Sequence, residues 1–123
     1  MTTDPTPANR TAPALAEAYF PAWSARDGER LRGLLADDVT FRGPLGSADG
    51  AQECVDGLMG MAQILERIEV VARVASGDDV ITWFDLHTRV ADPATTANWM
   101  HVVDGSIASI RVTFDPRGIL AAG

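Results

Sequence analysis

The side chains best suited to acid–base chemistry are one aspartate and two histidines on a pair of predicted strands. Asp85 and His87 lie on one side of the segment 80–90, and His101 lies in the segment 96–103 that follows. An imidazole oriented by a carboxylate can accept and return a proton near neutral pH. We therefore predict that Asp85 and His101 are catalytic and that His87 contacts a ligand.

The register between these two strands decides which side chains meet. If Val90 lies opposite Thr96, Asp85 faces His101 directly. Opposed residues have Cβ atoms about 4.5–5.5 Å apart, which is close enough for a side-chain hydrogen bond. A slip of two residues would instead place His101 opposite His87. Both registers keep two imidazoles and one carboxylate on the same side of the sheet.

Alternation gives the segment 80–90 two chemically different sides. One side is apolar, whereas the other mixes aromatic rings with ionisable groups: Ile81, Trp83, Asp85, His87 and Arg89. A strand presents successive side chains to opposite faces of its sheet, so only one of these sides can face the interior. Periodicity alone leaves open which side that is.

The elements that must position these residues change from helical to alternating patterns along the chain. Helical spacing is found from Thr11 and again after Asp27, and Asp49 with Gln52 resembles a capping box for a third helix that runs to about Leu65. Strands are expected at 39–42, 68–75, 80–90, 96–103 and 107–114. This order predicts the α+β class, with a cone-shaped, curved antiparallel sheet wrapped around three N-terminal helices as in a cystatin-like roll.

The 123 residues fit one domain. We expect a disordered tail at 1–10, a folded domain at 11–116 and a C-terminal tail at 117–123. The lone Cys54 cannot form an internal disulfide, and no apolar run approaches the roughly 18 residues of a membrane span. Without a signal-peptide pattern, the expected location is the cytoplasm.

The charge of the chain disfavours polyanionic partners. The net charge is −7, and the ten basic residues are all Arg, scattered singly. This charge repels phosphate backbones and anionic lipid surfaces, so neither nucleic acid nor a membrane is an expected partner. The absence of Lys with abundant Ala and Gly suggests a GC-rich bacterial source. No motif indicates a cofactor or a metal site.

The segment from Tyr19 to Pro44, YFPAWSARDGERLRGLLADDVTFRGP, carries a family resemblance. It resembles, without a gap, the opening of the nuclear-transport-factor-2-like domains, which include ketosteroid isomerases and SnoaL-like polyketide cyclases. The resemblance implies the same cone-shaped fold. It also places Gly43 where the isomerases carry the carboxylate that abstracts the substrate proton. A glycine cannot act as a base, so the resemblance implies that the isomerase route is closed.

The same resemblance implies a ligand cavity. It carries the oxyanion-hole tyrosine of the isomerases onto Tyr19 and a cavity-lining position onto Trp23. The second oxyanion-hole acid falls on Trp99 or His101, and either placement would turn that side of the strand inward. The other residues expected to line the cavity are Trp83, Ile110, Val112 and Phe114.

Two functions are compatible with these expectations. In the first, the cone holds a small hydrophobic molecule; if the protein is an enzyme, His101 oriented by Asp85 moves a proton and Tyr19 donates a hydrogen bond to a developing oxyanion. Isomerisation, cyclisation and epoxide hydrolysis all occur on this architecture in relatives. In the second, the domain is a non-catalytic binding or dimerisation module that buries Trp83 in a homodimer.

Overall fold

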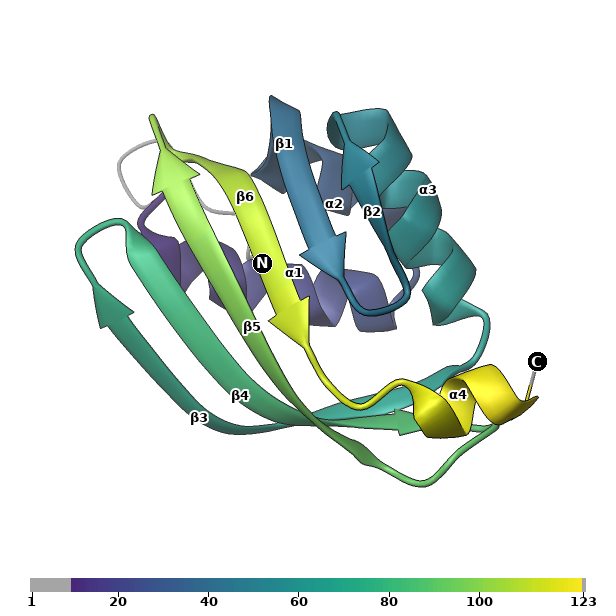
Figure 1. The fold of residues 1–123 in the computed structure, drawn as a ribbon. Coiled ribbons are helices and arrows are strands. Elements are labelled where there is room, and N and C mark those ends of the chain that lie inside the picture. The colour runs from purple at the N-terminus through teal and green to yellow at the C-terminus, as the bar shows by residue number, and fades with distance from the viewer. Residues whose placement is uncertain (1–9, 123) are drawn as a thin grey trace.

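The computed structural model describes residues 10–122, and Figure 1 shows helices packed in the hollow of one curved sheet. The helices are α1 (Ala12–Ser24), α2 (Gly28–Leu34), α3 (Ala51–Ala62) and the short C-terminal α4 (Arg117–Ala122). The strands are β1 (Leu35–Gly43), β2 (Gly46–Asp49), β3 (Leu65–Ser76), β4 (Asp79–Thr88), β5 (Ala94–Val103) and β6 (Ser106–Thr113). The predicted α+β cone is therefore confirmed.

The sheet has the strand order β2-β1-β6-β5-β4-β3. Strands β3 to β6 form an antiparallel meander, and β1 joins it by pairing with β6 in parallel. In Figure 1 the long strands β3, β4 and β5 bend strongly, and α1 crosses the side toward which they curve. The bend leaves a space between the sheet and the helices that side chains must fill or line.

Helix α1 supplies much of the core. Thr11 caps it through a hydrogen bond from the Ala14 amide, and its inward side buries Leu15, Tyr19 and Trp23. The Phe20 ring meets the Phe84 ring of β4 edge to face, with centroids 5.1 Å apart. These contacts fix α1 against the concave side of the sheet.

The concave side of β4 and β5 is mostly apolar, with three Thr and one Asn among its buried residues, and the convex side is mixed. On β4 the buried positions include Val80, Phe84 and Leu86, which alternate with the exposed Ile81 and Trp83. The buried positions of β5 are Thr96, Asn98, Met100 and Val102. The core therefore uses the apolar side of β4, as its alternation favours.

Several predicted boundaries shift. The helix expected to reach Leu65 ends at Ala62. Its N-cap is Gly50, which has a φ of 94° and no side chain that could form a capping hydrogen bond. Asp49, expected in a capping box, instead pairs with Arg42 at 2.9 Å across the β1–β2 hairpin. Residues 46–49, where no strand was predicted, form strand β2. Part of the expected C-terminal tail forms α4.

Most of the predicted disordered tail, 1–9, lies outside the described residues. Its last member, Arg10, is anchored: its guanidinium donates to the Gly33 carbonyl at 2.8 Å and to the Gly105 carbonyl. Within residues 10–122 no helix is long and apolar enough to cross a membrane.

Candidate functional site

A cavity of about 530 Å³ lies between the concave side of the sheet and helices α1 and α3. The β1–β2 hairpin contributes Phe41 and the residues from Gly43 to Ala48, and Phe114, just after β6, also lines the cavity. This volume falls in the range typical of small-molecule sites. The cavity is therefore the candidate site.

Apolar and aromatic side chains make most of the wall. They include Trp23, Phe41, Leu58, Met61, Leu86, Val112 and Phe114. The Trp23 indole N–H is satisfied inside the protein, since it donates to the Leu58 carbonyl at 2.9 Å. Trp23 therefore presents ring surface to the cavity, which suits a hydrophobic ligand.

Asn98 is the unusual polar group in the wall. It projects from the middle of β5, where its register partners are Thr82 on β4 and Val112 on β6. Only 3% of Asn98 is exposed, and within residues 10–122 its Oδ1 atom has no hydrogen-bond partner. A buried polar atom without a partner is rare and needs an explanation.

Tyr19 and Cys54 line the cavity as neutral groups. Burial raises the pKa of the Tyr19 hydroxyl well above its usual value, and the nearby Cys54 thiol raises it further. Burial also raises the pKa of Cys54 to about 11. Both groups therefore keep their protons at physiological pH, and neither can act there as a base or a thiolate nucleophile.

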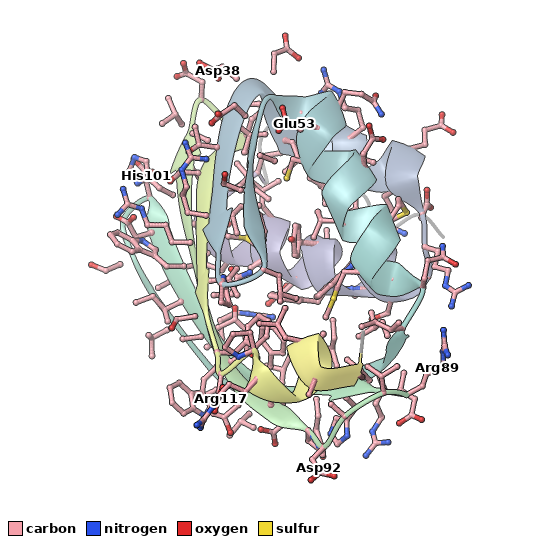
Figure 2. All side chains as sticks on the ribbon, turned by 45° about the vertical axis from the view of Figure 1, so that its right-hand side comes forward. Asp38, Glu53, Arg89, Asp92, His101 and Arg117 are labelled. Carbon is pink, nitrogen blue, oxygen red and sulfur yellow. The ribbon has the colours of Figure 1, made fainter. Side chains whose placement is uncertain are left out.

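The carboxylates that line the cavity belong to exposed residues of α3. These residues are Glu53 and Asp56, and the Asp56 carboxylate accepts a hydrogen bond from Gln52 at 2.8 Å. Figure 2 shows Glu53 on α3 and His101 on the far side of the sheet. The cavity thus combines buried neutral groups with exposed acidic residues.

The predicted pairing of Asp85 with His101 is wrong. In the structure Asp85 lies opposite Thr95, and His101 lies opposite Asp79. The predicted register assumed that pairing between the two strands extends to Val90 and Thr96. In the structure the last β4–β5 pair is Leu86 with Ala94. The Arg89 amide instead donates a hydrogen bond to the Ile64 carbonyl, just before β3. The longer connection shifts the register by several residues.

His101 does have a carboxylate partner, but on the convex side of the sheet. Its Nδ1 lies 2.9 Å from Asp79 Oδ1, which also accepts the Trp99 indole N–H at 2.8 Å. Hydrogen bonds from Trp99 and then His101 lower the pKa of Asp79. In Figure 2 His101 projects away from the helices. The expectation that Trp99 and His101 face inward is therefore wrong, and the catalytic prediction for Asp85 and His101 loses its geometric basis.

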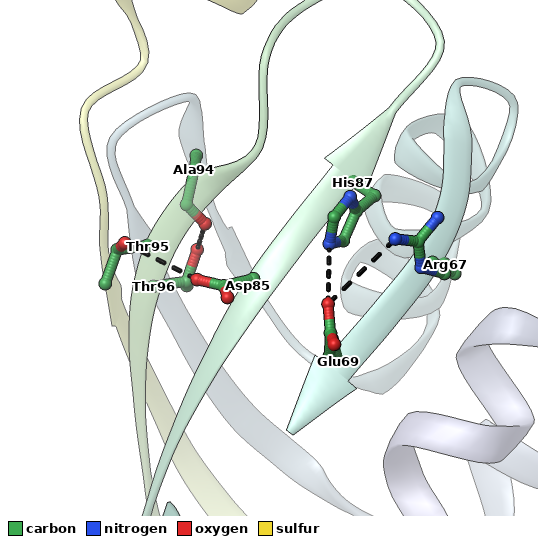
Figure 3. A network of polar contacts seen from close by, with 7 residues as sticks. All are labelled: Arg67, Glu69, Asp85, His87, Ala94, Thr95 and Thr96. Atoms are coloured by element: carbon green, nitrogen blue, oxygen red, sulfur yellow. Dashed lines mark hydrogen bonds and ion pairs between the residues drawn. The ribbon is translucent and has the colours of Figure 1, made fainter. Parts of the chain in front are cut away.

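His87 also lies on the convex side, far along β4 from the Asp79 cluster. Figure 3 shows its ring beside Glu69 of β3, with Nε2 and Oε1 3.0 Å apart, while Asp85 points toward Thr95. The sheet therefore separates His87 from the cavity. As a separate point, residues 10–122 contain no group of three or more His, Cys, Asp or Glu side chains placed to hold a metal ion.

The remaining predicted ligand contacts divide into two sets. Tyr19, Trp23, Val112 and Phe114 line the cavity. Ile110 is fully buried in the core behind it, and Trp83 and Trp99 are 48% and 43% exposed on the convex side. The sheet therefore separates both of these tryptophans from the cavity.

Sequence reasoning missed Asn98, and a signal for it was present. In the segment 96–103, alternate residues share one side of the strand, and Asn98 is the one amide on the side that also carries Thr96, Met100 and Val102. A polar residue within an apolar row of a strand marks a buried polar group, which must either be satisfied or serve a ligand. Cys54 and Phe41 also line the cavity without having been predicted to do so.

The cavity, the bent sheet and the three packed helices define a cone-shaped α+β class of fold. Residues 16–110 match the model of the SnoaL-like domain family, so the chain belongs to that family. The predicted resemblance to SnoaL-like domains is therefore confirmed, and the chain shares the fold of NTF2-like proteins. No protein with a curated description matches the chain.

Solved structures agree with this assignment. A Kribbella flavida protein is 25% identical, with a TM-score of 0.83 over 92% of this chain and 93% of that one. An NTF2-like protein from Cytophaga hutchinsonii is 22% identical, with a TM-score of 0.78 over 98% and 99%. A Catenulispora acidiphila protein with a ketosteroid isomerase-like fold, in complex with trimethylamine, is 18% identical, with a TM-score of 0.75 over 91% and 93%.

Proposed function

We propose that this protein binds a small, largely apolar molecule inside the cone. The observation that carries the proposal is the cavity of about 530 Å³, whose walls are mostly aromatic and aliphatic. Burying apolar ligand surface there contributes on the order of 25 cal/mol per Å² before the costs of association. The Catenulispora acidiphila relative, solved with trimethylamine, shows a small molecule with this fold.

The wall chemistry favours binding over proton transfer. The ionisable groups that are buried in the wall are Tyr19 and Cys54, and both are held neutral by burial. Gly43 lines the cavity at the position where the resemblance places the base of the isomerases. A general base needs a pKa near the operating pH and a position near the reacting atom. We therefore propose a ligand-binding role without acid–base catalysis by Asp85 and His101.

Two glycines of α3 give a matched test of the site. Gly57 lines the cavity and Gly60 does not, and a Cβ atom added at either position would meet nothing within 4 Å. Gly57→Phe places a ring at the cavity, whereas Gly60→Phe places the same ring elsewhere on the helix. Both substitutions replace a poor helix former, so both proteins should fold.

The measurement is isothermal titration calorimetry with 2-naphthol. We expect the wild type and Gly60→Phe to bind with affinities within a factor of about two, and Gly57→Phe to bind at least about 10-fold more weakly, a difference of about 1.4 kcal/mol. Equal affinity in all three proteins would place the ligand outside the cavity. No heat of binding in any of them would remove the proposed function.

A second copy of the chain is the candidate partner for the convex side of the sheet. Val74, Ile81 and Trp99 lie side by side across β3, β4 and β5, and Trp83 is exposed next to them. Arg111 stacks over Trp99 at 5.5 Å, close to the acidic Asp79. A surface with both charges around an apolar centre can complement itself across a two-fold axis.

Sedimentation equilibrium tests the homodimer. We expect a dimer for the wild type and a monomer for Trp83→Glu, because the new carboxylate would be buried without a partner in the interface. A wild type that stays monomeric at high concentration would contradict this part of the proposal, and the ligand site would be unaffected.

A further inference from the structure

The polar groups of the cavity wall differ in how they are satisfied. The Trp23 N–H donates to the Leu58 carbonyl, and the Thr96 hydroxyl donates to the Ala94 carbonyl at 3.0 Å. Asn98 Oδ1, which is buried in the same wall, has no partner among residues 10–122. The cavity wall therefore contains one buried acceptor atom that receives no hydrogen bond from the described residues.

The type of this atom restricts what can satisfy it. A carbonyl oxygen accepts hydrogen bonds and donates none, so its partner must bring an O–H or an N–H group. A ketone, an ether or a carboxylate would place a second acceptor against it. A site whose polar group is left unpaired by the wrong ligand discriminates strongly against that ligand.

The charge around the cavity restricts the ligand further. Tyr19 and Cys54 are neutral, and no Arg side chain lines the cavity within the described part of the chain. The acidic Glu53 and Asp56 lie at its edge. A carboxylate ligand would have to shed its water without gaining a cationic partner, which is costly.

We propose that the ligand is an uncharged alcohol or phenol whose hydroxyl group donates a hydrogen bond to Asn98 Oδ1 at the wall of the cavity. This proposal rests on the proposed function, and it names the chemical class that the same site selects. The apolar body of the molecule then occupies the space lined by residues such as Trp23 and Phe114, and Tyr19 lines the same cavity as a second neutral polar residue.

Three probes of one shape test the proposal by calorimetry at pH 7. 2-Naphthol offers a hydroxyl donor, 2-methoxynaphthalene has the same ring system without a donor, and 2-naphthoate is an anion. We expect 2-naphthol to bind about 10-fold more tightly than 2-methoxynaphthalene, and 2-naphthoate to bind most weakly. Equal affinity for the first two probes would overturn the proposal while leaving the binding function intact. Absence of binding by all three would overturn both.

Asn98→Leu is the diagnostic variant because it replaces the amide by an apolar side chain of similar size. The preference for 2-naphthol over 2-methoxynaphthalene should fall to a factor of about one. The melting temperature of the free protein should rise, since an unsatisfied buried acceptor is removed. A preference that survives in Asn98→Leu would contradict the assigned partner, even if the melting temperature rises.

Thr96→Val is the matched control on the same side of β5. It also removes a polar atom from the cavity wall, but its hydroxyl is already used by the Ala94 carbonyl. The preference for 2-naphthol should therefore remain near its wild-type value. If Thr96→Val abolished the preference as Asn98→Leu does, the selection would come from general wall polarity and the proposal would be wrong.

Discussion

The concave and convex sides of strands β4 and β5 are built from the same twenty or so residues, yet they carry opposite chemistry. The concave side buries Phe84, Leu86 and Met100 around one amide, Asn98. The convex side exposes two tryptophans and carries the hydrogen-bonded pairs of both histidines. Ionisable residues that stand out in the sequence of a strand therefore need not lie on the side of the sheet that lines a cavity.

The electrostatic reason is the cost of burying charge. An imidazole–carboxylate pair such as His101 with Asp79 loses little hydration free energy at a solvated surface, whereas burying it in an apolar interior carries a large desolvation penalty. The interior of this cone therefore uses neutral polar groups, and its ionisable members, Tyr19 and Cys54, keep their protons. A neutral interior suits recognition by hydrogen bonding and apolar contact.

The largest expected effect compares two neighbouring aromatic residues on β4. Phe84→Ala removes a ring that is 2% exposed and packs on Phe20, so it should lower the free energy of unfolding by about 3–5 kcal/mol. Trp83→Ala removes a half-exposed ring from the other side and should cost far less. Urea denaturation at a protein concentration that keeps the chain monomeric measures both. Similar losses in the two variants would break the distinction between the sides.

The alkaline pH dependence of stability sharpens the same comparison. An unfolded Cys thiol ionises near its ordinary pKa of 9.0, whereas folded Cys54 holds its proton to about pH 11. The unfolded state therefore binds fewer protons over this interval, and the free energy of unfolding should fall as the pH rises from 9 to 11. Tyr19, whose pKa is also raised, should add to the fall above pH 10.

Cys54→Ala provides the control for this titration. Denaturant unfolding of the variant should show a shallower decline between pH 9 and 10, where Tyr19 contributes little. An identical decline in wild type and variant would show that the Cys54 thiol is not held neutral by burial.

The smallest expected effect is on ligand affinity when the convex-side residues are changed. His101→Ala and Asp85→Ala should leave the affinity for 2-naphthol within a factor of about two, because the sheet separates both side chains from the cavity. Calorimetry on the two variants checks this. A 10-fold loss in either one would return that residue to the binding site.

Much of the fold could be predicted from the sequence because its signals are local. The apolar spacing of α1 and the alternation in β3 to β6 each depend on a few neighbouring residues, and the structure contains all of these elements. Strand β2 was missed because Gly46–Asp49 pairs only with its hairpin partner β1 and lacks an apolar pattern of its own. The parallel contact of β1 with β6 is long-range and leaves no local trace.

The site was harder to predict because it depends on the register between strands and on the side of the sheet to which each side chain points. Asp85 with His101 required a specific closure between β4 and β5, and a longer connection moved Asp79 into the place assigned to Asp85. The prediction that Trp99 and His101 face inward relied on an alignment with the ketosteroid isomerases across the turn after Val103, and this turn differs in length from theirs. An error of one residue there reverses the side, and the true inward neighbours are Asn98 and Met100. Tyr19 and Trp23 do line the cavity, and the resemblance that pointed to them runs through α1 without a gap.

A crystal structure of the protein with 2-naphthol decides between the cavity and the convex side as the binding site. We expect ligand density in the cavity lined by Tyr19, Asn98 and Phe114, with the ligand oxygen within hydrogen-bonding distance of Asn98 Oδ1. Ligand density on the convex side, against Trp83 or beside His101 and Asp79, with the cavity free of ligand, would contradict it.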